Sequence, residues 1–154
     1  SFDEDNDFTV LSQAEVIRAF AQVTSVLTTF LAVIAGISLI VGGIGIMNIM
    51  LVSVTERTRE IGLRKAVGAK QGDILMQFLT EAVTLGLAGG LIGLLLGIAG
   101  IVIIGSLSEN LRTTLAWESV VLAIGFSGAV GLFFGLYPAR RAARLNPIDA
   151  LRYE

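Results

Sequence analysis

The stretch Val54-Thr-Glu-Arg-Thr-Arg-Glu-Ile-Gly-Leu-Arg-Lys-Ala-Val-Gly-Ala-Lys-Gln-Gly-Asp-Ile-Leu75 decides the architecture, because it is a compact charged segment between two long apolar runs. It carries five of the eleven basic residues, whereas the runs on either side are almost free of charge. Such a segment predicts a rigid hairpin tip on the cytoplasmic side of a membrane, joined to a span at each end. That geometry would suit the transfer of movement from a soluble partner.

Composition places the chain among membrane proteins. Hydrophobic residues make up 54% of it and charged residues 16%, and its mean hydropathy is +0.80. A helix needs about 20 apolar residues to cross a hydrocarbon core of roughly 30 Å. Three blocks are long enough: about 26–52, 78–106 and 119–137. The alternative is three buried helices of a soluble protein. So short a chain, however, has no polar segments that could cover three such helices and shield them from water. The prediction is an all-α membrane protein with three spans.

The positions of Lys and Arg predict the orientation, since cytoplasmic loops collect basic residues close to the membrane. Five basic residues follow the first span and four follow the third. The N-terminal segment has only Arg18, and the connection between the second and third spans has only Arg112. We therefore expect the N-terminus outside and the C-terminus inside a cytoplasmic (inner) membrane.

The first apolar block belongs to a longer predicted helix, from about Gln13 to Val52. Apolar residues recur there at alternating spacings of four and three, which is typical of a coiled-coil seam. The seam residues are Val16, Phe20, Val23, Leu27, Phe30 and Ile34. At 1.5 Å per residue this helix would be about 60 Å long, about twice the hydrocarbon thickness. Its first turns are expected to form an extracytoplasmic stalk; the alternative is an interfacial helix broken near Thr24–Ser25.

Small residues repeat at every fourth position in the other two blocks, a spacing that lets helix backbones approach closely in lipid. The second block has Gly89, Gly93 and Gly97, with a neighbouring pair at Gly86 and Gly90; the third has Ser127, Gly131 and Gly135. Ordinary packing within the chain and a mobile or dimeric interface both fit this pattern.

Several kinds of chemistry are excluded by composition. The chain has no Cys and no His, which removes disulfides, thiol nucleophiles, imidazole acid–base catalysis and the usual soft metal sites. The stretch Gly42–Asn48 resembles a glycine-rich nucleotide loop only superficially, because it lies inside a span and no G-x-x-x-x-G-K-[ST] motif is present. The sequence therefore predicts no catalytic residues, no metal and no ATP binding by that route.

Two polar residues, Asn48 and Glu81, lie near the inner ends of the spans. Ionisable groups inside a membrane are candidates for function. Here both lie within a few turns of the expected cytoplasmic face, where Glu81 can reach water or Lys70. A structural hydrogen bond between two spans is the favoured role. A proton relay is the alternative, although no second buried titratable group is visible.

The segment after the third span is basic. Tyr137-Pro138 marks the expected exit from the membrane, and Ala139–Leu145 is predicted to form a short separate helix at the lipid surface, where anionic headgroups would attract it. A new helical turn is expected after Asn146, with Asn as the N-cap and Pro147 at the first helical position.

These motifs together resemble those of FtsX-like ABC permeases. Glu56–Ala69, followed by Asp73-Ile74, Gln77-Phe78 and Glu81-Ala82, is similar to the signature of that family, and Pro138–Arg152 is similar to its C-terminal motif. Within the family the chain most resembles the MacB branch, including Ile44–Leu51 before the charged segment.

The resemblance implies four spans, with a large extracytoplasmic domain between the first and the second. This chain is similar to the last three spans. Residues 1–11 would then be the end of the extracytoplasmic domain, and 12–154 the transmembrane domain. The segment at about 55–68 would be the coupling helix that docks on an ATPase. The implied coupling residues are Glu56, Arg57, Arg59, Glu60, Ile61, Leu63, Arg64 and Lys65, and the implied helix-packing residues are Gly89, Gly93, Gly97, Gly131 and Gly135.

The implied partners are an ABC ATPase subunit or domain, a second permease in a homodimer or heterodimer, the lipid bilayer, and a periplasmic adaptor, but no nucleic acid. ATP and Mg²⁺ would be bound by the ATPase, so this chain would hold no cofactor. The expected function is that of the permease in an ABC export or extrusion system, which passes ATPase-driven motion to extracytoplasmic domains. The alternative is an FtsX-type signalling module that regulates an extracytoplasmic hydrolase. A membrane enzyme is disfavoured by the absence of His, Cys and paired intramembrane carboxylates.

Overall fold

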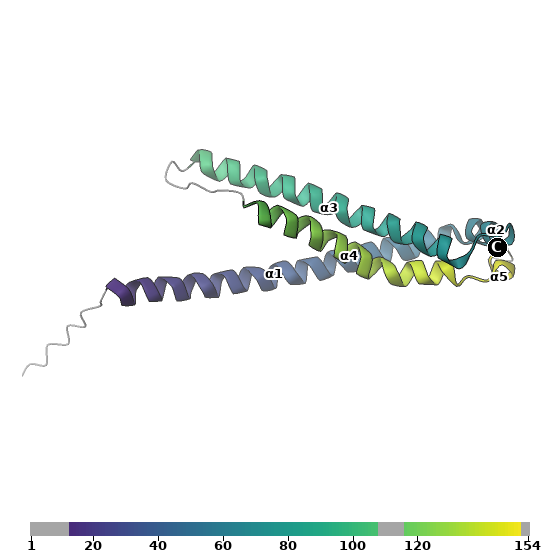
Figure 1. Cartoon of the computed structure of the whole chain (residues 1–154), viewed down its shortest axis with the longest axis horizontal. Helices are drawn as coiled ribbons and strands as arrows, with labels where there is room; N and C mark the ends of the chain where they lie inside the picture. Colours follow the sequence, from purple (N-terminus) through teal and green to yellow (C-terminus); the bar gives the residue numbers. More distant parts are fainter. Residues whose placement is uncertain (1–12, 108–115, 152–154) are drawn as a thin grey trace, which may run out of the picture. The chain divides into compact units, whose positions relative to one another are not determined.

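The computed structural model describes residues 13–107 and 116–151, and all regular structure in these ranges is helical (Figure 1). The helices are α1 (Gln13–Glu56), α2 (Thr58–Ala66), α3 (Gln71–Leu107), α4 (Trp117–Ala143) and α5 (Pro147–Leu151). Helices α1, α3 and α4 are long and apolar enough to cross a membrane. The prediction of an all-helical chain with three candidate spans is confirmed. The proposed end of an extracytoplasmic domain at residues 1–11 lies outside the described ranges.

The chain divides after Ser38 into two units, and α1 contributes residues to both. Helix α1 is continuous, as predicted, and ends at Glu56 rather than at Val52; a break near Thr24–Ser25 is wrong. In the first unit all described residues, 13–38, are exposed, including the predicted seam. Four hydroxyl groups there each donate to the carbonyl oxygen four residues earlier, so they add no unsatisfied polar group to an apolar helix. They belong to Thr24, Thr28, Thr29 and Ser38.

Within the second unit, α3 and α4 lie antiparallel and side by side (Figure 1). Small residues allow this contact. A Cβ atom added at Gly86 would lie 2.6 Å from the carbonyl oxygen of Ser127, and one added at Gly131 would lie 2.7 Å from the carbonyl oxygen of Ala82. At Gly135 an added Cβ would overlap the Cβ of Ala82. Backbones this close require residues without side chains at the contact.

The core of the second unit lies where the end of α1, α2, the start of α3 and the end of α4 meet (Figure 1). Its buried residues are Met50, Val54, Ile61, Ile74, Phe78, Ala82, Ala139 and Ala142. Farther along α1, Gly43 is buried against the ring of Phe134, which occupies the space that a side chain at residue 43 would need. The glycine-rich stretch of α1 is therefore a packing feature within a helix.

Helix α4 continues through Pro138, so the prediction of a separate basic helix at Ala139–Leu145 is wrong. Proline removes one backbone hydrogen bond and crowds the preceding turn. Here that loss is offset because Pro138 and the alanines that follow it are buried against the other helices. The helix ends at Ala143, where the backbone N–H of Arg144 donates to the carbonyl oxygen of Arg140 at 3.1 Å.

The short helix α5 begins as the sequence predicts. The side-chain oxygen of Asn146 accepts a hydrogen bond from the backbone N–H of Ile148 at 3.3 Å, and Pro147 occupies the first helical position. The asparagine thus satisfies one of the donors that the first turn leaves free.

Candidate functional site

The predicted coupling segment forms α2, a nine-residue helix separated from α1 by one residue. At that residue, Arg57, the backbone angles are φ −95° and ψ 11°. The hydrogen-bond spacing of a helix nevertheless continues across it: the N–H of Arg57 donates to the oxygen of Ser53 at 3.0 Å, and that of Ile61 donates to the oxygen of Arg57 at 2.9 Å. Because α1 extends through Glu56, the first predicted coupling residue lies on α1 and not on α2.

The other end of α2 is closed by a glycine. Gly68 has φ +107°, the only positive φ in the described residues, and its N–H donates to the oxygen of Lys65 at 3.1 Å. The N–H of Ala69 reaches back to the oxygen of Arg64 at 3.0 Å. This pair of bonds is a Schellman motif, in which the left-handed residue after the helix is usually glycine.

One face of α2 packs inside the chain. Ile61 is 3% exposed and belongs to the core. Gly62 lies against α5, where an added Cβ would come within 2.7 Å of the Cβ of Ala150. Sequence reasoning missed this contact. The signal was present, because a glycine inside a short helix costs about 1 kcal/mol relative to alanine and usually has a packing reason.

Lys65 lies on the same inner face and ties α2 to the end of α4. Its ammonium group donates to the carbonyl oxygens of Ala143 and Leu145, at 2.5 and 2.7 Å. Ala143 is the last residue of α4 and Leu145 follows it by two residues. Carbonyl groups at a helix C-terminus lack partners within the helix, and a positive charge is favourable there. Partial burial lowers the pKa of Lys65 from its usual value. The resemblance gave Lys65 a role in docking the ATPase, but the structure directs its ammonium group into the chain.

We expect Lys65→Met to loosen the attachment of α2 to α4 and α5. The variant keeps the unbranched apolar stem and loses two hydrogen bonds from a charged donor, each of which typically contributes about 1.5–3 kcal/mol. Thermal unfolding in detergent, followed by circular dichroism, should show a clear loss of stability. Lys70→Met is the matched control, since Lys70 is exposed and its ammonium group makes no hydrogen bond to the described residues. Equal stability of the two variants would contradict the tie.

Two polar links connect this region to α3. One comes from Arg57, between α1 and α2, and the other comes from Arg64 of α2. Arg57 forms an ion pair with Glu81 at 3.2 Å. Arg64 donates to Gln77 at 2.6 Å and to Glu60 at 2.5 Å. The sequence favoured a hydrogen bond between two spans for Glu81; its partner is instead Arg57, the residue between α1 and α2, and not Lys70. All four charged side chains are a third or more exposed, and exposed ion pairs contribute only about 0–1 kcal/mol. These links orient α2 more than they stabilise it.

The opposite face of α2, here called the outer face, consists of Arg59, Leu63 and Val67. Leu63 is 58% exposed and Val67 is 80% exposed. In the described part of the chain, Arg59 forms no ion pair, and neither does the nearby Glu56. The eight predicted coupling residues therefore divide: Ile61 and Lys65 serve the chain's own packing, Arg57, Glu60 and Arg64 form the polar links, and Glu56, Arg59 and Leu63 face outward.

The glycines of the predicted packing stripe also divide. Gly131 and Gly135 contact α3, but nothing in the described structure lies within 4 Å of a Cβ added at Gly89, Gly93 or Gly97. The close approach to α4 is made by Gly86 and Gly90 instead. A role for the three open glycines in packing against another chain stays a prediction.

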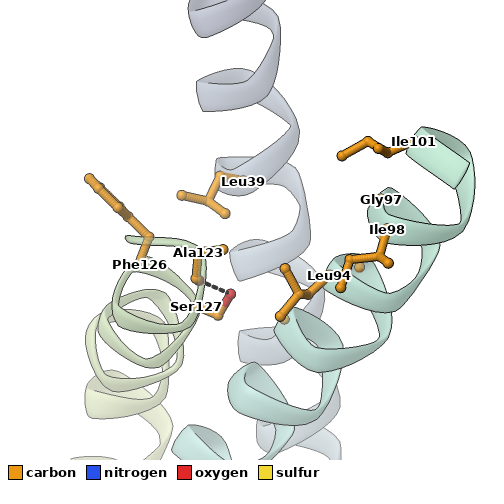
Figure 2. Close-up of a pocket in the computed structure, with 10 residues that line it drawn as sticks. Leu39, Leu94, Gly97, Ile98, Ile101, Ala123, Phe126 and Ser127 are labelled. Atoms are coloured by element: carbon orange, nitrogen blue, oxygen red, sulfur yellow. Dashed lines mark hydrogen bonds between the residues drawn. The ribbon is translucent and has the colours of Figure 1, made fainter. Parts of the chain in front are cut away.

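Gly93 and Gly97 line an open apolar groove of about 390 Å³ between α3, α4 and Leu39 of α1 (Figure 2). Leu94, Ile98 and Phe126 also line it. The hydroxyl of Ser127, which reaches its wall, donates to the carbonyl oxygen of Ala123 in its own helix at 2.7 Å (Figure 2). The lining has no charged residue.

Asn48 is exposed, and no hydrogen bond from its side chain joins it to another described span.

The model of the FtsX-like permease C-terminal region matches residues 20–147 of this sequence, which include most of α1 and all of α2, α3 and α4. The chain belongs to the FtsX-like permease C-terminal family. The resemblance read from the charged segment and the C-terminal motif is thus confirmed. This FtsX-like chain is a membrane domain of the ABC transporter permease type.

Individual relatives agree with this assignment. The FtsX-like chain is 52% identical over 147 residues to the macrolide export ATP-binding/permease protein MacB of Bdellovibrio bacteriovorus, covering 96% of this chain and 22% of that protein. It is 54% identical over 140 residues to MacB of Rhodopirellula baltica, covering 91% and 20%. It is 48% identical over 150 residues to the ABC transporter permease YknZ of Bacillus subtilis, covering 97% and 38%. The chain thus spans between about a fifth and two fifths of the length of these relatives.

Proposed function

We propose that this chain is the transmembrane part of a permease in an ABC export or extrusion system, and that α2 is its coupling helix. The observation that carries the proposal is the division of α2 into two faces. The inner face is hydrogen-bonded to the end of α4 and packed against α3 and α5, whereas the outer face leaves Leu63 and Val67 exposed beside Arg59, which forms no ion pair with a described residue. A helix held firmly by its own chain and apolar on its free side suits docking in a groove on another protein.

In this proposal α2 and α5 lie on the cytoplasmic side, as the distribution of Lys and Arg predicts. A separate ATPase domain or subunit binds ATP and Mg²⁺, and its closure pushes on α2. The movement passes into α1, whose first turns form the extracytoplasmic stalk, and onward to extracytoplasmic domains. The groove beside Gly93 and Gly97 supports mechanical transmission over conduction through a wide pore, because its lining has no charged group to contact a polar substrate.

The exposed seam of α1 supports a dimer of permeases. Its six apolar residues repeat with coiled-coil spacing and are all exposed in the first unit. In an apolar coiled-coil seam, such residues insert between those of a facing helix. We propose that a second permease, identical or related, supplies that helix. Export is preferred over signalling because two of the relatives are named as macrolide exporters.

The decisive experiment replaces Leu63 by aspartate in the complete permease assembled with its ATPase. An apolar anchor at the centre of an interface contributes about 2 kcal/mol or more, so ATPase binding should weaken by roughly thirtyfold. We expect loss of co-purification and of transport-linked ATP hydrolysis, with unchanged insertion in the membrane. Leu63→Met is the matched control and should behave as the parent. Normal docking and transport in Leu63→Asp would show that the outer face of α2 is not the coupling surface.

The same position tests the orientation, because the chain has no Cys of its own. In a cysteine-free permease, Leu63→Cys should react with a membrane-impermeant maleimide in inside-out vesicles and be protected by the bound ATPase. Reaction in intact cells would overturn the proposed orientation.

A further inference from the structure

The inner end of α4 has two faces of opposite character. Pro138, Ala139, Ala142 and Ala143 are buried against the rest of the second unit. Tyr137, Arg140, Arg141 and Arg144, three or four residues apart around the helix, are exposed. The three arginines are here called the arginine face. None of them forms an ion pair with a described residue, in contrast to Arg57 and Arg64 of the coupling region.

Aromatic residues place the arginine face relative to a bilayer. Trp117 begins α4 and Tyr137 lies 20 residues later, and both side chains are more than half exposed. At 1.5 Å per residue they are roughly 30 Å apart along the helix, which equals the thickness of a hydrocarbon core. Trp and Tyr are enriched at the two membrane–water interfaces. The arginine face, which begins three residues beyond Tyr137, therefore falls at the level of the lipid headgroups.

The arginine face lines an open hollow of about 680 Å³, together with Tyr137, Asn146 and Asp149. Three guanidinium groups and one carboxylate give its lining a formal charge of +2. The side chain of Asn146 is already used to cap α5, so the charged groups decide what the hollow attracts. A site with this charge at the headgroup level favours an anion.

We propose that this hollow binds the phosphate headgroup of an anionic phospholipid. Guanidinium groups form paired, charge-assisted hydrogen bonds with phosphate oxygens, which an ammonium group cannot match in geometry. The exposed apolar surface of α4 next to the hollow favours a lipid over an acidic protein as the occupant. Phe133 is 74% exposed one turn before Tyr137, so an apolar surface leads directly into the arginine face. That order, apolar then aromatic then basic, matches the order of acyl chain, glycerol and phosphate in a lipid.

The test is a titration of the purified chain in detergent with phosphatidylglycerol or phosphatidylcholine, read by native mass spectrometry of lipid adducts. We expect tighter binding of phosphatidylglycerol. In the double variant Arg140→Gln/Arg144→Gln, affinity for that lipid should fall roughly fivefold for each arginine removed, since a basic residue near an anionic surface contributes about that factor. Affinity for phosphatidylcholine should not change. Arg140→Lys/Arg144→Lys keeps the charge but not the paired hydrogen bonds, and should give an intermediate loss even if the glutamine variant folds poorly.

The matched control is Arg59→Gln/Lys70→Gln, which removes the same charge from exposed residues around α2 and should keep the preference for phosphatidylglycerol. Equal affinity of the parent for the two lipids, or an equal loss in both glutamine variants, would overturn the proposal. Displacement of phosphatidylglycerol by an equal concentration of inorganic phosphate would identify a free-anion site and not a lipid site. If Arg140→Gln/Arg144→Gln keeps the lipid preference but releases the ATPase from the complete permease, the hollow docks a protein. Because this test needs no ATPase, it can fail while the proposed coupling function of α2 holds.

Discussion

Ile61→Asp is expected to unfold the hairpin end of the chain. Ile61 is 3% exposed and packs in the core with Phe78 and Ile74. Loss of a buried Ile side chain forfeits about 1.5–3 kcal/mol, and a carboxylate left without a partner in its place adds the cost of burying a polar group. The sum reaches the range above about 4 kcal/mol, which is exceptional for a single substitution. Thermal unfolding in detergent, followed by circular dichroism, should show a strongly lowered midpoint.

Leu63→Asp is the matched control, because it places the same charge two residues farther along α2, on a side chain that is 58% exposed. A substitution at such a position usually changes stability by about 0.5 kcal/mol or less. The pair therefore separates two causes of lost coupling: Ile61→Asp should abolish it through misfolding, and Leu63→Asp through loss of the outer face. An equal loss of stability in both variants would contradict the assignment of Ile61 to the core.

The second large effect is expected for Gly131→Leu, at the contact between α3 and α4. Even the Cβ of the new side chain would lie 2.7 Å from the carbonyl oxygen of Ala82 and 3.0 Å from the Cα of Val83. These are backbone atoms of a helix, which cannot move aside as the tip of a side chain can. Overpacking typically costs about 1–3 kcal/mol, and an obstructing backbone raises the cost toward or beyond the upper end. The thermal midpoint of the monomeric chain in detergent should fall accordingly.

Gly93→Leu provides the comparison, since nothing in the described structure lies within 4 Å of an added Cβ there. In a monomeric sample its stability should stay close to that of the parent, because the new side chain can extend into the open groove. A loss as large as that of Gly131→Leu would show that the open glycines also pack against part of the chain. A change seen only when the chain is dimeric would support the predicted role of Gly93 between chains.

Hydrophobic composition was sufficient to predict the spans. Apolar blocks long enough to cross a bilayer leave few alternatives, and α1, α3 and α4 include all three predicted ranges. The start of α5 was predictable because Asn-Pro is a local capping signal that does not depend on distant residues. The family was predictable because the charged segment and the C-terminal motif together are far more specific than either would be alone.

Tertiary contacts decided what the sequence could not. Pro138 looked like a helix end because proline disfavours a helix interior, but the buried face beside it outweighs that preference. Gly86 and Gly89 belong to repeats of the same spacing, and only the position of α4 determines which repeat makes contact. Ile61 and Leu63 are both apolar residues of one short helix. Their opposite exposure follows from how α2 packs, which its own composition does not reveal.

The two ends of α2 differ as mechanical joints. Toward α1 there is a single residue, Arg57, across which helical hydrogen bonding continues, so bending or twisting there strains bonds that are already formed. Toward α3 the chain leaves through Gly68, whose backbone has the widest rotational freedom of any residue type, and then through two more residues before α3 begins. The backbone connection of α2 to α1 is therefore rigid, and its backbone connection to α3 is flexible. In the proposed coupling, the continuous connection would pass a motion of α2 directly into the adjoining part of α1, whereas α3 would follow through the packing of Ile61 and the hydrogen bond from Arg64 to Gln77.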